Sequence, residues 1–188
     1  MQSLFGPMLL VFTDSHVLGR SLTIMASGML VSSFMIGIFS KSNNQIMVVS
    51  IALVFSGLFF SMLGFSKNII FIIITGFMFF LTLPFINTGL DVLIRKNVDN
   101  KLQGRVWSIV SVISQLGMVI AFGLSGFIAD YIFNPLLMEH GILAASVGKL
   151  VGTGAGRGIA FMFVLSGLFI IAAGILFSRL KVIKSLER

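Results

Sequence analysis

Hydrophobic and charged residues alternate along the chain in long blocks. Five stretches between consecutive charged residues contain no charge and have lengths of 20, 25, 23, 24 and 21 residues, at 21–40, 42–66, 68–90, 106–129 and 158–178. A helix of about 20 apolar residues crosses the ~30 Å hydrocarbon layer, because each residue adds about 1.5 Å. The pattern therefore predicts an all-α membrane protein with full spans at 21–40, 46–65, 69–90, 106–130 and 158–178.

A shorter apolar segment, about 4–13, precedes these spans. The first charge is Asp14, so the segment is too short to cross the hydrocarbon layer as a helix. It has no preceding Lys or Arg and no small-residue cleavage site directly after it, which argues against a signal peptide. We expect a partial span, a tilted short one or an interfacial piece, within a single membrane domain of residues 1–188. Longer loops are expected at 91–105 and 131–157, and a kink or break at Pro84.

The distribution of Lys and Arg predicts the orientation of the chain. Nine lie in the loop after 21–40, in 91–105 and in the tail 179–188, against four on the opposite side. Cytoplasmic loops carry the excess of positive charge, so the C-terminus is expected in the cytoplasm. Trp107 and Tyr131 flank the span 106–130 about 36 Å apart, as interfacial anchors would, although two residues can also fall there by coincidence.

Composition excludes several classes of protein. The chain is 57% hydrophobic with a mean hydropathy of +1.09, and it contains no Cys. Soluble enzymes, disordered tails and disulfide-stapled scaffolds do not have this composition. The net charge of +7 does not predict a nucleic-acid partner, because the basic residues sit at span ends, where the orientation rule explains them.

One face of the span 106–130 carries small and polar residues at helical spacing. Its members are Ser108, Ser111, Gln115, Met118, Phe122, Ser125 and Ala129. Small residues let membrane helices approach closely, so helix packing is the main interpretation of this and similar stripes in the other spans. The alternative is the lining of an aqueous path, which the polarity of Gln115, Asn87 and Thr88 favours. Our candidate substrate-path residues are Asn87, Ser111 and Gln115.

Charges at the span ends suggest a second candidate feature. Asp91 ends the span 69–90 and Arg105 precedes the span 106–130 on the same predicted side. The intervening residues could fold back and let the two side chains pair as an inner gate; two independently solvated charges are the alternative. None of the five charge-free stretches holds an ionisable carboxylate, so a group that couples transport to an ion is not expected there.

No catalytic or metal site is expected. The glycines of 152–157 imitate a phosphate-binding loop but lack the preceding strand that such a loop requires. His16 and His140 are far apart, without acidic residues at ligand spacing. No nucleophile and base stand in a recognisable arrangement, so we predict neither an enzyme nor a cofactor.

Several motifs, in order, resemble one branch of a transporter family. Residues 102–108, Leu-x-Gly-Arg-Val-x-Ser, resemble the start of the eleventh helix of major facilitator superfamily exporters of the macrolide-efflux and enterobactin-exporter-like branch. Further resemblances are Gly126-x-x-Ala-Asp130, Gly154 to Ala160 after Leu137-Met138-Glu139, and Pro84 followed by Asn87. By this resemblance the chain is the C-terminal six-helix half of a major facilitator fold, with its first helix truncated.

The resemblance implies a bacterial inner-membrane exporter of small amphipathic compounds, such as drugs, macrolide-like molecules or siderophores. Such proteins work by alternating access between two six-helix halves, so one half alone is expected to be inactive. The chain would be a fragment, would pair with a separate N-terminal half, or would pair with a second copy, in that order of preference. A non-transporting membrane protein, such as an assembly factor or sensor subunit, is the alternative function.

Overall fold

The computed structural model describes residues 2–10, 13–39, 44–66, 68–137, 148 and 157–179. These residues form α1 (Gln2–Leu10), α2 (Ser15–Phe39), α3 (Gln45–Met62), α4 (Ile69–Asn97), α5 (Asn100–Ile128), the π-helix η1 (Ala129–Phe133), α6 (Asn134–Leu137) and α8 (Arg157–Arg179). Within the described part of the chain the fold is entirely helical. Five of its helical stretches, starting at Ser15, Gln45, Ile69, Asn100 and Arg157, are long and apolar enough to cross a membrane.

Helices α4 and α5 extend beyond the charge-free stretches that predicted them at the connection between the two. The expected loop 91–105 is absent, because α4 continues to Asn97 and α5 begins at Asn100. Val98 adopts an extended conformation with φ −113° and ψ 128°, which ends α4. The prediction of a loop there was wrong because charges mark the membrane border, whereas a helix continues into water until a residue ends it.

Pro84 does not break α4, which stays helical from Ile69 to Asn97. The proline removes one backbone hydrogen bond, a loss that membrane helices tolerate where neighbouring helices support them. Helices α2 and α3 both pack against α4 and supply that support. The expected loop 131–157 is helical up to Leu137, and most of its remaining residues lie outside the described part of the chain.

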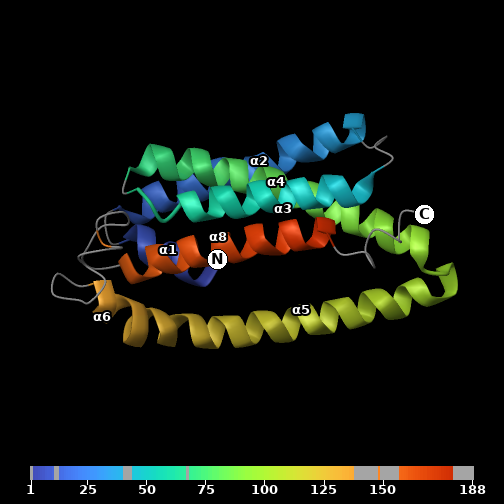
Figure 1. The fold of residues 1–188 in the computed structure, drawn as a ribbon. Helices are drawn as coiled ribbons and strands as arrows, with labels where there is room; N and C mark the ends of the chain where they lie inside the picture. Colours follow the sequence, from blue (N-terminus) through green and yellow to red (C-terminus); the bar gives the residue numbers. More distant parts are fainter. Residues whose placement is uncertain are drawn as a thin grey trace.

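Four long helices pack in the order α2, α4, α3, α8, and α5 runs apart from them (Figure 1). Glycines allow a close approach between α3 and α8. A Cβ atom on Gly57 would lie 2.5 Å from the carbonyl oxygen of Gly167, and one on Gly167 would lie 2.5 Å from that of Gly57. Helix packing, the main interpretation of the small residues in these spans, is therefore confirmed where α3 crosses α8.

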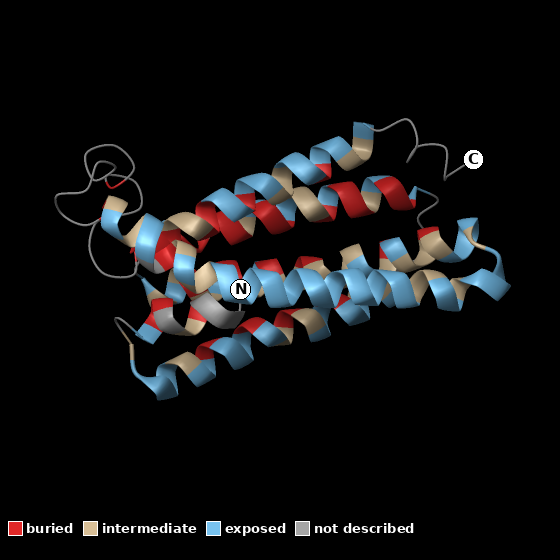
Figure 2. Cartoon of the chain, turned by 90° about the horizontal axis from the view of Figure 1, so that it is seen from below, coloured by how far each residue is buried: buried red, intermediate tan, exposed pale blue. Residues whose placement is uncertain are grey.

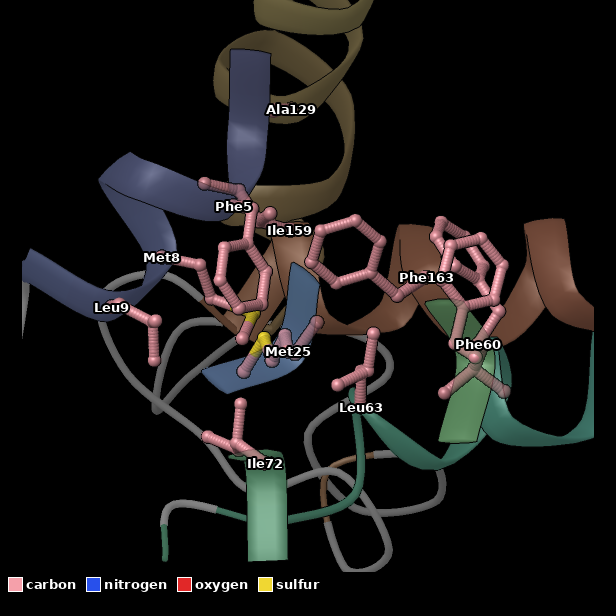
Figure 3. Close-up of a cluster of buried hydrophobic side chains, with 13 residues drawn as sticks. Phe5, Met8, Leu9, Met25, Phe60, Leu63, Ile72, Ala129, Ile159 and Phe163 are labelled. Atoms are coloured by element: carbon pink, nitrogen blue, oxygen red, sulfur yellow. The ribbon is translucent and has the colours of Figure 1, made fainter. Parts of the chain in front are cut away.

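A cluster of buried apolar side chains closes one end of the bundle (Figure 3). Phe60 of α3 lies at its centre, with ring centroids 5.1 Å from Phe79 of α4 and 5.1 Å from Phe163 of α8. Phe5 of α1 joins the same cluster, 6.5 Å from Phe163. The short α1 is therefore packed into this end of the bundle.

Candidate functional site

The α4–α5 hairpin and the body of α5 hold all five predicted site residues. Because α2, α4 and α8 end where α3 and α5 begin, the hairpin lies at the end of the bundle opposite the aromatic cluster (Figure 1). Described basic side chains gather at this end, namely Arg95, Lys96, Lys101, Arg105 and Arg179. This clustering is what the positive-inside pattern expects of one membrane face; which face it is stays a prediction.

Helix α5 is the least covered of the long helices. None of its residues is buried among the described part of the chain, and side chains from Ser108 to Leu124 are exposed without interruption. Figure 2 shows α5 in the colour of exposed residues along nearly its whole length. It contacts the rest of the chain at its two ends, through the short connection to α4 and through η1 and α1.

The polar stripe of α5 is therefore uncovered from Ser108 to Phe122, as are the other faces of this helix, whereas its last member, Ala129, is buried. Gln115 lies 10 residues after Arg105 and 15 before Asp130, near the middle of the charge-free stretch. Two serines of α5 bond back to their own helix, Ser108 to the Gly104 carbonyl at 2.9 Å and Ser125 to that of Phe122 at 3.1 Å. The side chains of Ser111 and Gln115 form no hydrogen bond among the described residues.

Asn87 lies on α4 and is also exposed. It stands about 15 Å from the hairpin along α4, and Ser111 stands about 16 Å from it along α5, at 1.5 Å per residue. The antiparallel hairpin thus places Asn87 and Ser111 at a similar depth. No hydrogen bond joins them within the described part of the chain, so the structure aligns these two residues without bringing them into contact.

The charge pair described near the hairpin lies within α4. Asp91 accepts a hydrogen bond at 2.8 Å from Nε of Arg95, one helical turn further along α4. Arg105, the predicted partner, is exposed on α5. An i,i+4 neighbour is always within reach on a helix, whereas a partner on α5 requires the two helices to approach. The structure therefore pairs Asp91 with Arg95, and an inner gate formed by Asp91 and Arg105 stays a prediction.

Two large grooves lie elsewhere, along both sides of α3. One, of about 650 Å³, runs between α3 and α8 and has Asn44, Ser50 and Ser178 among its few polar groups. The other, of about 420 Å³, runs between α3 and α4 and is almost wholly apolar. Both share the exposed ridge formed by Ile51 and Phe55. Sequence patterns gave no signal for them, and apolar grooves on a membrane helix suit lipid chains as well as any ligand.

A buried arginine and a π-helix at the opposite end were also not predicted. Arg157 begins α8 and is only 5% exposed. It follows the glycine-rich residues 152–156, which lie outside the described residues, as do His140 and Lys149. Next to it, a Cβ on Gly158 would lie 2.5 Å from the backbone nitrogen of Asn134, so α8 starts in close contact with the end of η1. π-helices often occur at functional sites, and no sequence feature marked this one.

The predicted anchors Trp107 and Tyr131 lie at opposite ends of the α5–η1 stretch. Trp107 is half-buried, and Tyr131 is 74% exposed and stacks on Phe127 with ring centroids 4.9 Å apart. Among the described residues, no three His, Cys, Asp or Glu side chains converge on a possible metal position. Comparisons with protein-family models, curated proteins and solved structures found no match.

Proposed function

We propose that this chain is one helical half of a secondary exporter of small amphipathic compounds. The observation that supports it is the uncovered polar stripe of α5, in which the Gln115 side chain lies near mid-span and, like that of Ser111, has no hydrogen-bond partner among the described residues. The resemblance of residues 102–108 to exporters of this kind supports the same function.

The physical argument concerns the cost of polar groups in lipid. An amide that leaves water for hydrocarbon without a hydrogen bond loses several kcal/mol, on the order of 2–7. The Gln115 side chain therefore faces water or another polar group rather than lipid. A path between two bundles supplies water at this depth, and Met118 and Phe122 on the same face offer apolar contacts to an amphipathic substrate.

Alternating access follows from the same arrangement. A single bundle cannot open to one side and then the other, so activity requires a second bundle that rocks against this one. The aromatic cluster around Phe60 holds one end of this bundle together. Because the charge-free stretches hold no carboxylate, the group that couples transport to an ion gradient belongs to the second bundle or to the membrane borders.

An efflux assay in cells tests this function, with an amphipathic fluorescent dye as the probe. We expect Gln115→Leu to slow dye export and Gln115→Asn, which keeps the amide, to retain most of it. Ile120→Leu, a conservative change at an exposed apolar position of the same helix, is the matched control and should leave export unchanged. The chain is expressed alone and together with a second bundle. If the membrane-inserted chain changes dye export in neither case, a non-transporting role is favoured instead.

Thiol labelling tests the water path independently of transport. The chain contains no Cys, so Ser111→Cys, Gln115→Cys and Ile120→Cys each introduce a single thiol. A membrane-impermeant maleimide should label the first two and leave the third unlabelled. Labelling of Ile120→Cys alone would show that the opposite face of α5 lines the path and would overturn the assignment.

A further inference from the structure

The larger groove, of about 650 Å³, has a polar end and an apolar end. It lies between α3 and α8, which run side by side in the bundle (Figure 1). Asn44, directly before α3, and Ser178, in the last turn of α8, lie at the polar end. Val54 and Phe55 of α3 lie at the apolar end. The volume is within the range of about 300–1,000 Å³ that small-molecule sites have.

The length and depth of the groove match one leaflet of a bilayer. Its polar end lies at the membrane border, because Ser178 is the last residue of the charge-free stretch 158–178. Phe55 lies 11 residues after Asn44, which is about 16 Å further along α3. One leaflet contributes about 15 Å of the ~30 Å hydrocarbon layer. The groove therefore runs from the border to the middle of the membrane.

The body of the groove suits a hydrocarbon chain better than a polar ligand. The Ser50 hydroxyl donates to the Ile46 carbonyl at 2.8 Å, and the Ser178 hydroxyl donates to that of Ile175 at 2.7 Å. Both hydroxyl protons are therefore used within their own helices. Among the described residues, no charged side chain lines the groove. Binding inside it then depends on apolar contact.

A positive charge stands at the polar end. Arg179 lies one helical turn beyond Ile175, so it extends the groove-lining face of α8. It is exposed, and it forms no ion pair within the described part of the chain. Neither Asp91 nor Asp99, the acidic residues described at this end of the bundle, lines the groove. The end dipoles of α3 and α8 have opposite signs here and offset each other, which leaves the guanidinium as the charge nearest the groove.

We propose that this groove binds one anionic phospholipid of the adjoining leaflet. One acyl chain lies along α3 as far as Phe55, and the phosphate lies beside Arg179. A guanidinium donates parallel N–H···O bonds to phosphate, and it attracts a headgroup with a net negative charge more than one that also carries a cation. This end of the bundle is the one predicted to be cytoplasmic, and the cytoplasmic leaflet carries the anionic lipids. The lipid site does not depend on the exporter function.

Native mass spectrometry of the purified full chain tests the choice of headgroup. The probes are phosphatidylglycerol and phosphatidylcholine with the same acyl chains. We expect tighter binding of phosphatidylglycerol, and Arg179→Gln should weaken it about 5-fold while leaving phosphatidylcholine binding unchanged. Lys101→Gln removes a positive charge at the same end of the bundle, outside the groove, and should leave both affinities within about 2-fold. Equal affinities for the two lipids, or an equal loss in the two variants, would overturn the proposal.

Filling the groove tests where the acyl chain lies. Ile175→Trp enlarges a side chain that lines the groove, whereas Leu176→Trp adds the same ring at an exposed neighbour outside the lining. The first should lower the affinity for both lipids about 5-fold or more, and the second should leave it within about 2-fold. Glycerol phosphate, which lacks acyl chains, should not displace phosphatidylglycerol. Unchanged binding in Ile175→Trp, or displacement by glycerol phosphate, would show that charge alone holds the lipid and would overturn the groove as its site.

Discussion

The reciprocal contact between Gly57 and Gly167 makes a quantitative prediction about alanine substitution. In Gly57→Ala the new methyl would lie 2.5 Å from the Gly167 carbonyl oxygen and 2.8 Å from the backbone nitrogen of Ile171. Carbon and oxygen normally approach to about 3.3–3.6 Å, so α3 and α8 must separate by about 1 Å. Overpacking of this kind costs about 1–3 kcal/mol.

Gly117→Ala on α5 is the matched control. Its methyl would meet nothing within 4 Å. Replacing glycine by alanine within a helix also favours the helix by about 0.8–1.0 kcal/mol. That gain is common to both variants and cancels in their difference. We therefore expect Gly57→Ala to be less stable than Gly117→Ala by about 1–3 kcal/mol, which is the overpacking cost alone.

The measurement is unfolding of each purified variant in mixed micelles of increasing denaturing-detergent content, followed by circular dichroism. The free energies of unfolding are compared at a fixed micelle composition. A difference below about 0.5 kcal/mol, or Gly117→Ala being the less stable variant, would refute the close crossing of α3 and α8. A loss of stability in both variants would instead indicate that α5 is covered at Gly117.

Two further outcomes follow from single contacts. A double-mutant cycle on Asp91 and Arg95 should give a coupling free energy of about 0.3–0.5 kcal/mol, as for exposed i,i+4 pairs. The cycle on Asp91 and Arg105 should give no coupling. The reverse result would favour an ion-paired gate across the hairpin. Phe60→Ala should cost about 2 kcal/mol of unfolding free energy through the cavity it leaves, whereas Phe34→Ala, at a side chain 79% exposed, should stay within about 0.5 kcal/mol.

The spans could be predicted because charged residues are excluded from hydrocarbon, so each span appears in the sequence as a long stretch without charge. The ends of the helices could not, because a helix ends where the backbone is capped or extended. At the end of α4, Asn97 donates from Nδ2 to the Leu93 carbonyl at 2.8 Å, and Val98 is extended. The charges from Asp91 onward, which suggested a loop, lie on a continuing helix. Pro84 does not break α4 for a related reason, since tertiary packing on α4 outweighs a single local signal.

The candidate site was likewise predictable only in part from the sequence. The spacing of Ser111 and Gln115 correctly placed both on one helix, and the structure shows that they are uncovered. A stripe of small and polar residues indicates that a helix has a contact face, without indicating which chain supplies the contact. Gly57 and Gly167 contact each other within the chain, whereas a Cβ on any glycine of α5 would meet nothing within 4 Å. The grooves beside α3 depend on the shapes of three helices together, which no periodicity in one segment encodes.

The unequal lengths of the helices bear on the membrane itself. Helix α3 has 18 residues and is about 27 Å long, whereas the 24 uncharged residues at 106–129 span about 36 Å. A hydrocarbon layer of about 30 Å is slightly too thick for the first and too thin for the second. A helix shorter than the hydrocarbon layer is accommodated by a thinner bilayer or by its flanking residues, and a longer one by tilt or by a thicker bilayer. A thicker membrane would bring α5 upright and a thinner one would tilt it further, so that lipid chain length sets the angle at which its polar stripe crosses the bilayer.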